Sequence, residues 1–294
     1  MNSMRQGDTA TRGRGENQID GNSSSRRVTV SPRRRVPLII GHRGAAAVAP
    51  ENTLISFQRA LDDGADGIEF DVRLASDGGA VVIHDATLRR TALRKGLVRN
   101  FPSGELSAMD AGSWFNLRRP TLARAEYAEA KIPTLSSVFE MLRDSDALLY
   151  VEMKCGARTR APLAREVARL IQRYSLNELV VVESFDLPSI VEIKRLDASL
   201  RTAALFDRKL TRPVPSARWM IERAINCGAE EIALQRSLAT RRTVGQAAQH
   251  GLSTVVWTVD SPAWVTRAMK SGVRAIITNN PAKICARRNQ LLIL

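Results

Sequence analysis

The sequence predicts an α/β fold in which eight parallel strands close into a barrel. From Val36 onward, short β-branched or apolar runs alternate with amphipathic segments, which is the pattern of repeated strand–helix–strand units. About eight such runs can be recognised, and barrels of this class commonly need about 250 residues, so one domain can take up most of the 294-residue chain. The composition, 44% hydrophobic and 25% charged, is that of an ordinary globular protein and excludes disorder throughout.

The expected strands are short and rich in Val, Ile and Leu. The second strand unit combines two runs, because a partner run follows it closely. In chain order the runs are 37–41, 66–72 with its partner 80–83, 148–153, 179–184, 200–206, 231–235, 253–259 and 274–278. Helical periodicity between these runs indicates helices that include 53–61, 134–143, 162–174, 216–227 and 239–249.

The interval 86–131 breaks this alternation. It is too long for an ordinary loop, and it contains the stretch Phe101-Pro-Ser-Gly-Glu105, whose Pro, Ser and Gly residues favour irregular structure. We interpret it as a small insertion after the second strand unit. Because the loops that follow barrel strands build the active face, an insertion here is placed to shape substrate access.

Residues 1–35 are polar, rich in Gly, Ser, Asn and Arg, and lack periodicity, which is the composition of a disordered segment. We therefore predict a disordered basic tail at 1–35 and one barrel domain at 36–294. The tail supplies part of the formal net charge of +14, and the barrel supplies the rest. A basic protein favours anionic partners, which include nucleic acid, an acidic membrane surface and a phosphate-bearing small molecule.

The cysteines and the hydropathy pattern predict the cellular setting. Cys155, Cys227 and Cys285 have neither the number nor the spacing of a disulfide framework or a zinc site. No apolar stretch approaches the roughly 20 residues needed to cross a bilayer, and the N-terminus lacks the apolar core of a secretory signal. We expect a soluble cytoplasmic protein without a transmembrane segment, and the sequence predicts no particular oligomeric state.

Two of the three histidines lie directly after apolar runs, in Leu38-Ile-Ile-Gly-His42 and in Val81-Val-Ile-His84. In a parallel barrel the carboxyl ends of the strands carry catalysis, and imidazole is well suited to moving protons near neutral pH. One such histidine alone would favour a structural role. Two in separate units, each beside charged residues, favour catalysis by His42 and His84.

Carboxylates recur on the expected strands. Glu69 and Asp71 are two residues apart, so both point to one face of their strand, and two like charges so close repel each other unless a cation or a proton neutralises them. Glu152, on the next expected strand, is a candidate third ligand. Oxygen ligands without a cysteine or histidine cluster favour Mg²⁺ or Ca²⁺ over Zn²⁺ or copper. The alternative is an internal salt-bridge network that also contains Arg43 and Lys154.

Four further residues are candidates for substrate contacts. Arg43 and Lys154 suit a phosphoryl group, and together with a metal they can stabilise charge that develops on a phosphate oxygen. Glu51 is a candidate buttress for His42 or Arg43, or part of the cap of the helix that follows. Trp257, on a late strand, is either a core residue or a platform for the substrate.

Taken together, these residues resemble the glycerophosphodiester phosphodiesterase family from Pro37 to about Lys283. The motifs that carry the resemblance are His42-Arg43-Gly44, Pro50-Glu51-Asn52-Thr53, Gly64 to Val72, His84-Asp85, Met109 to Phe115, Ile132 to Leu135, Val151-Glu152-Met153-Lys154 and Val256-Trp257-Thr258-Val259. One departure is visible, since Asn279 stands where such proteins usually carry Asp after the last strand.

The resemblance implies a TIM (β/α)8 barrel that hydrolyses glycerophosphodiesters to glycerol 3-phosphate and an alcohol, an activity of lipid and glycerol metabolism. It further implies that Glu69, Asp71 and Glu152 hold the metal, that His42 and His84 act as general acid and base, and that Arg43 and Lys154 contact the phosphate. In the mechanism that it implies, the glycerol 2-hydroxyl attacks phosphorus, and water then opens the cyclic phosphate.

Two alternatives stay open at this point. A lysophospholipase D-like activity on the same scaffold needs a wider and more apolar mouth, and the aromatic content of 5% favours a water-soluble diester instead. A catalytically silent barrel that binds anions or RNA is the other alternative. The complete set of histidines, carboxylates and lysine argues against it, so we expect a small-molecule phosphodiester as the partner and no specific nucleic acid.

Overall fold

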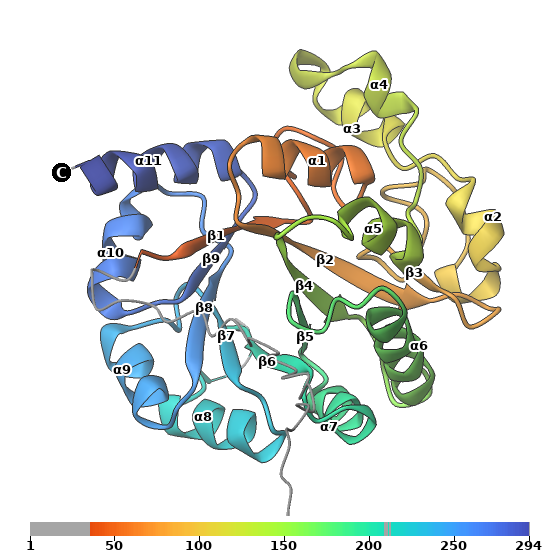
Figure 1. Cartoon of the computed structure of the whole chain (residues 1–294). Helices are drawn as coiled ribbons and strands as arrows, with labels where there is room; N and C mark the ends of the chain where they lie inside the picture. The colour runs from red at the N-terminus through yellow and green to blue at the C-terminus, as the bar shows by residue number, and fades with distance from the viewer. Residues whose placement is uncertain (1–35, 209–210, 212, 294) are drawn as a thin grey trace, which may run out of the picture. The chain divides into compact units, whose positions relative to one another are not determined.

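The computed structural model describes residues 36–208, 211 and 213–293 (Figure 1). The predicted tail at 1–35 lies outside these residues. Among the described residues no helix is long and apolar enough to cross a membrane.

Eight parallel strands close into a barrel, which confirms the predicted fold class. Around the barrel the strand order is β1, β9, β8, β7, β6, β5, β4 and β2, and β2 pairs with β1 to close the ring. The strands are β1 (Leu38–His42), β2 (Gly67–Leu74), β4 (Leu148–Met153), β5 (Val180–Ser184), β6 (Arg201–Phe206), β7 (Glu231–Gln235), β8 (Ser253–Trp257) and β9 (Ala275–Thr278). The short strand β3 (Ala80–Val82) pairs antiparallel with β2 and extends it beyond the barrel.

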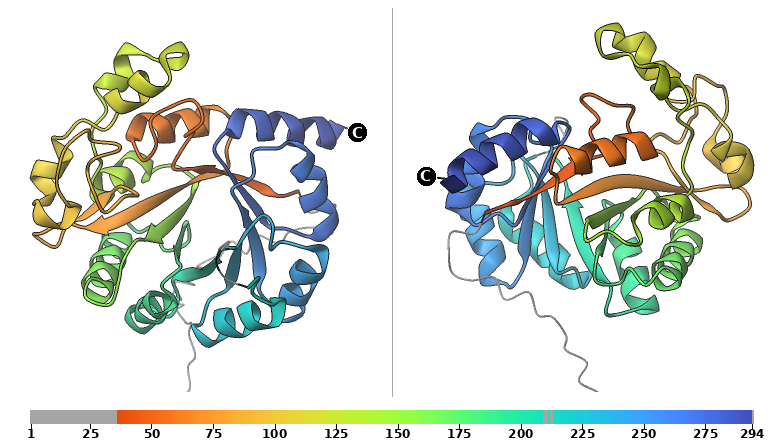
Figure 2. Two further views of the ribbon diagram at one scale, coloured as in Figure 1. Left: turned by 180° about the vertical axis from the view of Figure 1, so that it is seen from behind. Right: turned by 45° about the horizontal axis from the view of Figure 1, so that its top comes forward.

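Helices surround the strands, as Figures 1 and 2 show. They are α1 (Leu54–Asp62), α5 (Leu135–Leu142), α6 (Arg160–Arg173), α7 (Leu187–Leu196), α8 (Ala217–Asn226), α9 (Arg241–Gln249), α10 (Ala263–Ser271) and α11 (Pro281–Ile293). The five helices that the sequence indicated are present with shifts of one or two residues at their ends. Helices α7, α10 and α11 were not among the named predictions.

Side-chain caps fix where several of these helices begin. Thr53, Thr134, Ser216 and Thr240 each accept a hydrogen bond from the backbone N–H three residues later, which satisfies a donor that the first helical turn leaves free.

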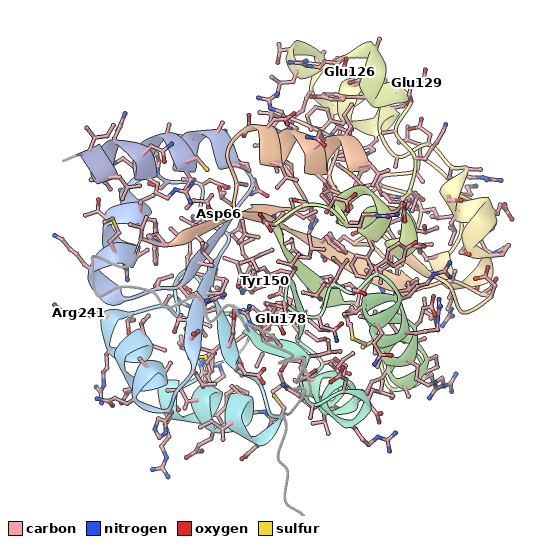
Figure 3. All side chains as sticks on the ribbon, in the orientation of Figure 1. Asp66, Glu126, Glu129, Tyr150, Glu178 and Arg241 are labelled. Atoms are coloured by element: carbon pink, nitrogen blue, oxygen red, sulfur yellow. The ribbon has the colours of Figure 1, made fainter. Side chains whose placement is uncertain are left out.

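The core has an outer layer and an inner layer. In the outer layer, alternate strand residues such as Ile68, Phe70 and Val151 pack against the helices. In the inner layer, Ile40, Tyr150 and other residues of the opposite parity fill the barrel, as Figure 3 shows for Tyr150. This period-two alternation directs Glu69 and Glu152 into the barrel, as the strand pattern predicted.

Charged groups fill the barrel at the amino ends of its strands. Glu231, on β7, accepts a hydrogen bond from the Tyr150 hydroxyl at 2.9 Å and pairs with Arg201 and Arg274. The opposite end, where the carboxyl ends of the strands meet, contains the predicted catalytic residues.

The insertion lies between β3 and α5 and folds into short helices. They are η1 (Val98–Asn100), α2 (Ser103–Ser107), α3 (Ser113–Arg118), η2 (Pro120–Leu122) and α4 (Ala125–Ala128). Trp114, Phe115 and Tyr127 form a small apolar cluster with Ala49, and the Tyr127 hydroxyl donates to the Val48 carbonyl at 3.0 Å. The insertion therefore packs on the loop between β1 and α1, while Glu126 and Glu129 lie on its outer part (Figure 3).

Candidate active site

A cavity of about 200 Å³ opens at the carboxyl ends of the barrel strands. We call it the catalytic pocket. Its lining brings together seven of the nine residues that the sequence proposed for the site, in addition to one buried glutamate and three apolar side chains. The lining residues are His42, Arg43, Glu69, His84, Glu152, Lys154, Glu183, Phe185, Leu205, Trp257 and Ile277.

His42 is the last residue of β1, and the side-chain amide of Asn279 orients its ring. Its Nδ1 lies 2.6 Å from Oδ1 of Asn279, and the Nδ2 of Asn279 in turn donates to Asp260 at 2.8 Å. Since the amide oxygen can only accept, His42 Nδ1 carries the hydrogen and Nε2 is left as a proton acceptor. Burial, followed by the nearby Arg43 charge, lowers the pKa of His42 from 6.5 to about 4, so this ring is neutral at pH 7.

His84 follows β3, and its ring is oriented by a carboxylate. Nδ1 of His84 lies 2.7 Å from Oδ1 of Asp85, and Asp85 also accepts two hydrogen bonds from Arg90, at 2.8 and 3.1 Å. Burial is the largest cause that lowers the pKa of His84, whereas Asp71 and Asp85 act in the opposite direction. The two catalytic candidates therefore differ in their Nδ1 partner, which is neutral for His42 and negatively charged for His84.

Arg43 stands at a strained turn directly after β1. Its φ of 53° lies in the left-handed region, which non-glycine residues rarely adopt and which is typical of functional sites. The turn directs its backbone N–H to Glu69 at 3.0 Å and its guanidinium to Glu51 at 2.8 Å and Asp71 at 3.1 Å. Glu51 thus contacts Arg43, and it also accepts two hydrogen bonds from Arg90.

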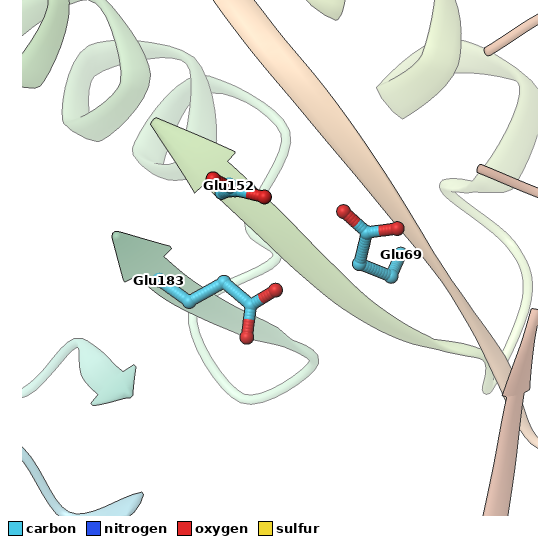
Figure 4. A group of neighbouring side chains, drawn as sticks. All are labelled: Glu69, Glu152 and Glu183. Atoms are coloured by element: carbon cyan, nitrogen blue, oxygen red, sulfur yellow. The ribbon is translucent and has the colours of Figure 1, made fainter. Parts of the chain in front are cut away.

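Three buried glutamates converge from neighbouring strands: Glu69 on β2, Glu152 on β4 and Glu183 on β5 (Figure 4). One carboxylate oxygen from each lies within 4.8 Å of the others. Burial is the main cause that raises all three pKa values, with the neighbouring negative charges next, and the pKa of Glu152 rises to about 7. Crowded carboxylates of this kind favour a bound cation.

The carboxylates fit a hard divalent ion. Oε2 of Glu183 is buried and has no hydrogen-bond partner among the described residues, although buried polar atoms almost always have one. Carboxylate oxygens are the ligands that Mg²⁺ and Ca²⁺ prefer. Glu69, Glu152 and Glu183 are therefore able to hold such an ion, and the chemistry of the donors is what the sequence predicted.

Asp71 lies beside this cluster but contacts cations of the protein itself. Its Oδ1 is 3.1 Å from the Lys154 ammonium, its Oδ2 is 3.1 Å from Arg43 Nε, and Asn52 donates to it at 2.8 Å. Burial by itself raises the pKa of Asp71, but the positive charges of Arg43 and Lys154 outweigh it and hold this pKa well below its usual range. The metal-ligand role of Asp71 stays a prediction, and part of the salt-bridge network that was its alternative is present.

Lys154 and Trp257 complete the pocket. The Lys154 ammonium lies 2.6 Å from Glu152 and 5.7 Å from the centre of the Phe185 ring. Trp257 packs edge-on against Phe185, with ring centres 5.5 Å apart, so its side chain forms a wall of the pocket. The role of Trp257 as a platform for the substrate stays a prediction.

Five residues at or beside the pocket were not proposed as site residues from the sequence. They are Glu183, Asp85, Arg90, Asn279 and Asp260. For Glu183 a signal was present, because a glutamate interrupts the apolar run Val180-Val-Val-Glu183 near the end of its strand. In the sheet Glu183 is the register partner of Glu152, which is itself the partner of Asp71. Arg90 gave no such signal, because it lies in the irregular insertion and its partner Glu51 is 39 residues away in the sequence.

Comparisons with known proteins identify relatives of the chain. Residues 42–283 match the model of the glycerophosphoryl diester phosphodiesterase family. A glycerophosphodiester phosphodiesterase of Caldanaerobacter subterraneus is 34% identical over 244 residues, which cover 83% of this chain and 94% of the relative. One from Bacillus subtilis is 30% identical over 251 residues, which cover 83% of this chain and 84% of the relative.

Solved structures show the same arrangement of strands and helices. A phosphodiesterase of Oleispira antarctica, solved in complex with the product sn-glycerol-3-phosphate, superposes with a TM-score of 0.76 at 26% identity and covers 86% of this chain and 97% of its own. A glycerophosphodiester phosphodiesterase of Agrobacterium tumefaciens gives a TM-score of 0.69 at 28% identity, with 85% and 99% covered. The chain belongs to the glycerophosphoryl diester phosphodiesterase family.

Proposed function

We propose that this protein is a metal-dependent phosphodiesterase that hydrolyses glycerophosphodiesters to glycerol 3-phosphate and an alcohol. The observation that carries the proposal is the catalytic pocket, in which two imidazoles, two cationic side chains and three carboxylates meet. Family membership supports the same reaction class. So does the relative from Oleispira antarctica, whose bound product is sn-glycerol-3-phosphate.

Glu69, Glu152 and Glu183 would hold the ion, and Asp71 is a further candidate. When bound, Mg²⁺ or Ca²⁺ supplies positive charge that stabilises the charge developing on phosphate oxygens. Nη1 and Nε of Arg43 lie against Glu51 and Asp71, which leaves its Nη2 group available to donate to a phosphate oxygen. Lys154 adds a second positive charge at the pocket wall.

His42 acts as the base in the first step. Its Nε2 removes the proton from the glycerol 2-hydroxyl, which attacks phosphorus, while His84 gives a proton to the oxygen of the departing alcohol. The assignment follows from the Nδ1 partners, because the negative charge of Asp85 favours a protonated ring at His84 more strongly than the neutral Asn279 amide does at His42. The product of this step is a cyclic phosphate.

Water opens the cyclic phosphate in the second step, in which the two histidines exchange roles. His84, now neutral, removes a proton from water, and His42, now protonated, returns a proton to the glycerol 2-oxygen. Both rings then have their starting protonation states, and glycerol 3-phosphate leaves.

Release of glycerol 3-phosphate from glycerophosphocholine tests the proposal. We expect turnover that EDTA abolishes and that added Mg²⁺ or Ca²⁺ restores, and a loss of at least about 100-fold in kcat for His42→Ala and for Glu69→Ala. His250→Ala is the matched control, because His250 caps the end of α9 outside the catalytic pocket. A folded protein without turnover on a panel of diesters with either metal would instead indicate a silent, anion-binding barrel.

A further inference from the structure

A second and larger cavity lies next to the catalytic pocket. It has a volume of about 840 Å³ and shares Phe185 and Leu205 with the catalytic pocket. We call it the side cavity. Its walls come from the segment after β5, from the end of β6 and from the beginning of α8, namely Phe185, Asp186, Leu187, Pro188, Leu205, Phe206, Asp207, Pro213, Val214, Pro215, Ser216, Trp219 and Arg223.

The catalytic pocket is smaller than most cavities that enclose a whole small ligand. Its volume of about 200 Å³ is below the range of about 300–1,000 Å³ that is usual for cavities that hold a small ligand. The phosphate and the groups that react fit there, so the remaining part of a larger diester must extend beyond it. Because Phe185 and Leu205 border both cavities, the side cavity is the space into which that part can extend.

Nine of the thirteen residues that line the side cavity are apolar or aromatic, and the surface of the cavity is about as polar as it is apolar. Phe206 and Trp219 pack edge to face with ring centres 5.9 Å apart, and Phe185 forms the wall nearest the catalytic pocket. Three of these side chains are exposed to water: Phe185 by 41%, Trp219 by 47% and Val214 by 56%. Grouped exposed apolar surface commonly marks a binding site, and covering it with an apolar ligand is favourable.

The charges in the side cavity argue against a cationic ligand. Asp186 accepts two hydrogen bonds from Arg160, at 2.6 and 2.8 Å, and is neutralised by it. The Trp219 ring already has the Arg223 guanidinium 5.1 Å from its centre, and the Phe185 ring has the Lys154 ammonium at 5.7 Å. Asp207 and Arg223 contribute opposite charges to the wall. The protein's own cations thus occupy the ring positions that would attract a quaternary ammonium group.

We propose that the side cavity binds an uncharged alkyl or acyl group attached to one of the two alcohols of the phosphodiester. The inference rests on the proposed phosphodiesterase function and names its substrate class. The apolar chain can be on the departing alcohol or on the glycerol, because both extend from the phosphate. The experiment distinguishes the two.

Two series of soluble substrates test this proposal. In the first, methyl, butyl and hexyl esters of glycerol 3-phosphate place the chain on the departing alcohol. In the second, glycerophosphocholine is compared with its 1-butanoyl and 1-hexanoyl derivatives, which place the chain on the glycerol. We expect kcat/KM to rise about two- to fourfold per added methylene in one series. If kcat/KM is independent of chain length in both series, the proposal is wrong.

Variants of α8 connect the effect to the side cavity. Trp219→Ala should reduce the rise of kcat/KM with chain length, measured relative to the methyl ester for each variant, to less than half. Ile225→Ala is the matched control, because Ile225 is an exposed apolar residue of the same helix that does not line the cavity. A second variant, Trp219→Glu, places a charge in the cavity and should abolish the rise, with the melting temperature measured for each variant.

Two outcomes contradict the inference in different ways. If Trp219→Ala lowers kcat/KM for glycerophosphocholine but not for the alkyl esters, the cavity binds a cationic head group instead of an apolar chain. If neither the methyl ester nor glycerophosphocholine is hydrolysed, the proposed phosphodiesterase function itself fails, and the proposed substrate class fails with it.

Discussion

Glu183 and Glu231 are two buried glutamates on barrel strands that differ in their partners. Glu231 pairs with Arg201 and Arg274, whereas Glu183 forms no ion pair with any described residue and lies beside Glu69 and Glu152. Neutralising a carboxylate that lies beside other carboxylates relieves repulsion. Neutralising a carboxylate that is paired with arginines leaves the buried positive charges of those arginines without a partner.

We therefore predict opposite effects for the same substitution at these two positions. Without metal at pH 8, Glu183→Gln should be at least as stable as the unsubstituted protein, while Glu231→Gln should lose about 2–4 kcal/mol of unfolding free energy. Added Mg²⁺ or Ca²⁺ should raise the melting temperature of Glu183→Gln less than that of Glu231→Gln. Urea unfolding and calorimetry measure both effects. Equal metal responses would exclude Glu183 from the ion site.

Asn279 and Asp260 form a hydrogen-bonded pair that can be exchanged. Asp260 accepts from the Asn279 side chain and backbone, each at 2.8 Å, and from Thr278 at 3.0 Å. With the two residues exchanged, an asparagine at 260 can still accept from the backbone and donate to the carboxylate at 279, which can still accept from His42. Asn279→Asp alone instead places two carboxylates in contact.

We predict that the exchange restores activity that the single variants lose. Asn279→Asp and Asp260→Asn should each lower kcat by about tenfold, and the double variant should return to within about threefold of the original enzyme. Because the carboxylate at 279 raises the pKa of His42, which must be neutral to act as the base, the low-pH limb of the rate profile should move to higher pH. A double variant no better than the single ones would show that this pair does not position His42.

At the scale of residues, a candidate site residue could be predicted from the sequence when its place within a strand was visible there. His42, Glu69 and Glu152 were found because strand ends and alternation are visible in the sequence. Glu183 was overlooked although it had the same signal. The roles of Asn279 and Asp260 could not be found in this way, because their contact joins the ends of two strands and depends on the geometry of both loops.

At the scale of elements, the insertion contributes to the active site through Arg90. The Arg90 guanidinium donates two hydrogen bonds to Glu51, both of 2.7 Å, and two to Asp85, of 2.8 and 3.1 Å. Glu51 in turn holds Arg43, and Asp85 holds His84. Arg90 thus connects the loop after β1 to the segment after β3, and each of its partners holds a residue for which we propose a role in the reaction.

We predict that Arg90→Gln lowers kcat about 10- to 100-fold with little change in the melting temperature, because both orienting carboxylates lose their shared partner. Arg90→Lys should recover only part of the activity, since an ammonium group cannot form the forked hydrogen bonds of a guanidinium. Arg94→Gln is the control, because Arg94 is an exposed arginine of the same insertion. An active Arg90→Gln enzyme would contradict this role.

The strands were more predictable than their connections. Periodicity gave the bounds of β4 and β7 without error, because buried parallel strands are apolar and short. Helix α10 begins after Pro262 and α11 at Pro281, and both follow polar loops with weak periodicity, so neither was among the named predictions. The antiparallel direction of β3 depends on the tight turn at Asp77–Gly79, where Gly78 adopts a φ of 86°.

At the scale of the whole molecule, the fold could be predicted because eight similar units can close only with neighbouring strands in order. The structure adds the ring closure between β1 and β2, which brings His42 next to Glu69 in register. Among the described residues the barrel begins with β1 at Leu38.

We predict that a variant lacking residues 1–34 keeps its activity and its melting temperature. All eight barrel strands and every residue of the catalytic pocket lie after the deletion. Activity on glycerophosphocholine and thermal unfolding, each measured beside the full chain, provide the check. A fall of more than about 5 °C, which corresponds to roughly 2 kcal/mol for a domain of this size, would show that these residues belong to the folded domain.

The buried glutamates also connect the stability of the whole barrel to pH and to the metal. The pKa of Glu152 is raised to about 7, and those of Glu69 and Glu183 are raised as well. Between the ordinary glutamate pKa and these raised values, the folded protein binds more protons than the unfolded chain. Their contribution to stability is therefore complete at low pH and is lost as pH rises through the folded pKa values.

A bound divalent ion removes this loss, because it replaces the protons and compensates the negative charge. We predict that Mg²⁺ or Ca²⁺ raises the melting temperature more at pH 8 than at pH 5. We also predict that metal binding releases protons. Titration calorimetry in buffers that differ in ionisation enthalpy measures the number of protons released. Glu152→Gln should weaken both effects, whereas Glu126→Gln, an exposed site on the insertion, should leave them unchanged. A metal response that is equal at both pH values would mean that the ion does not bind to the glutamate cluster.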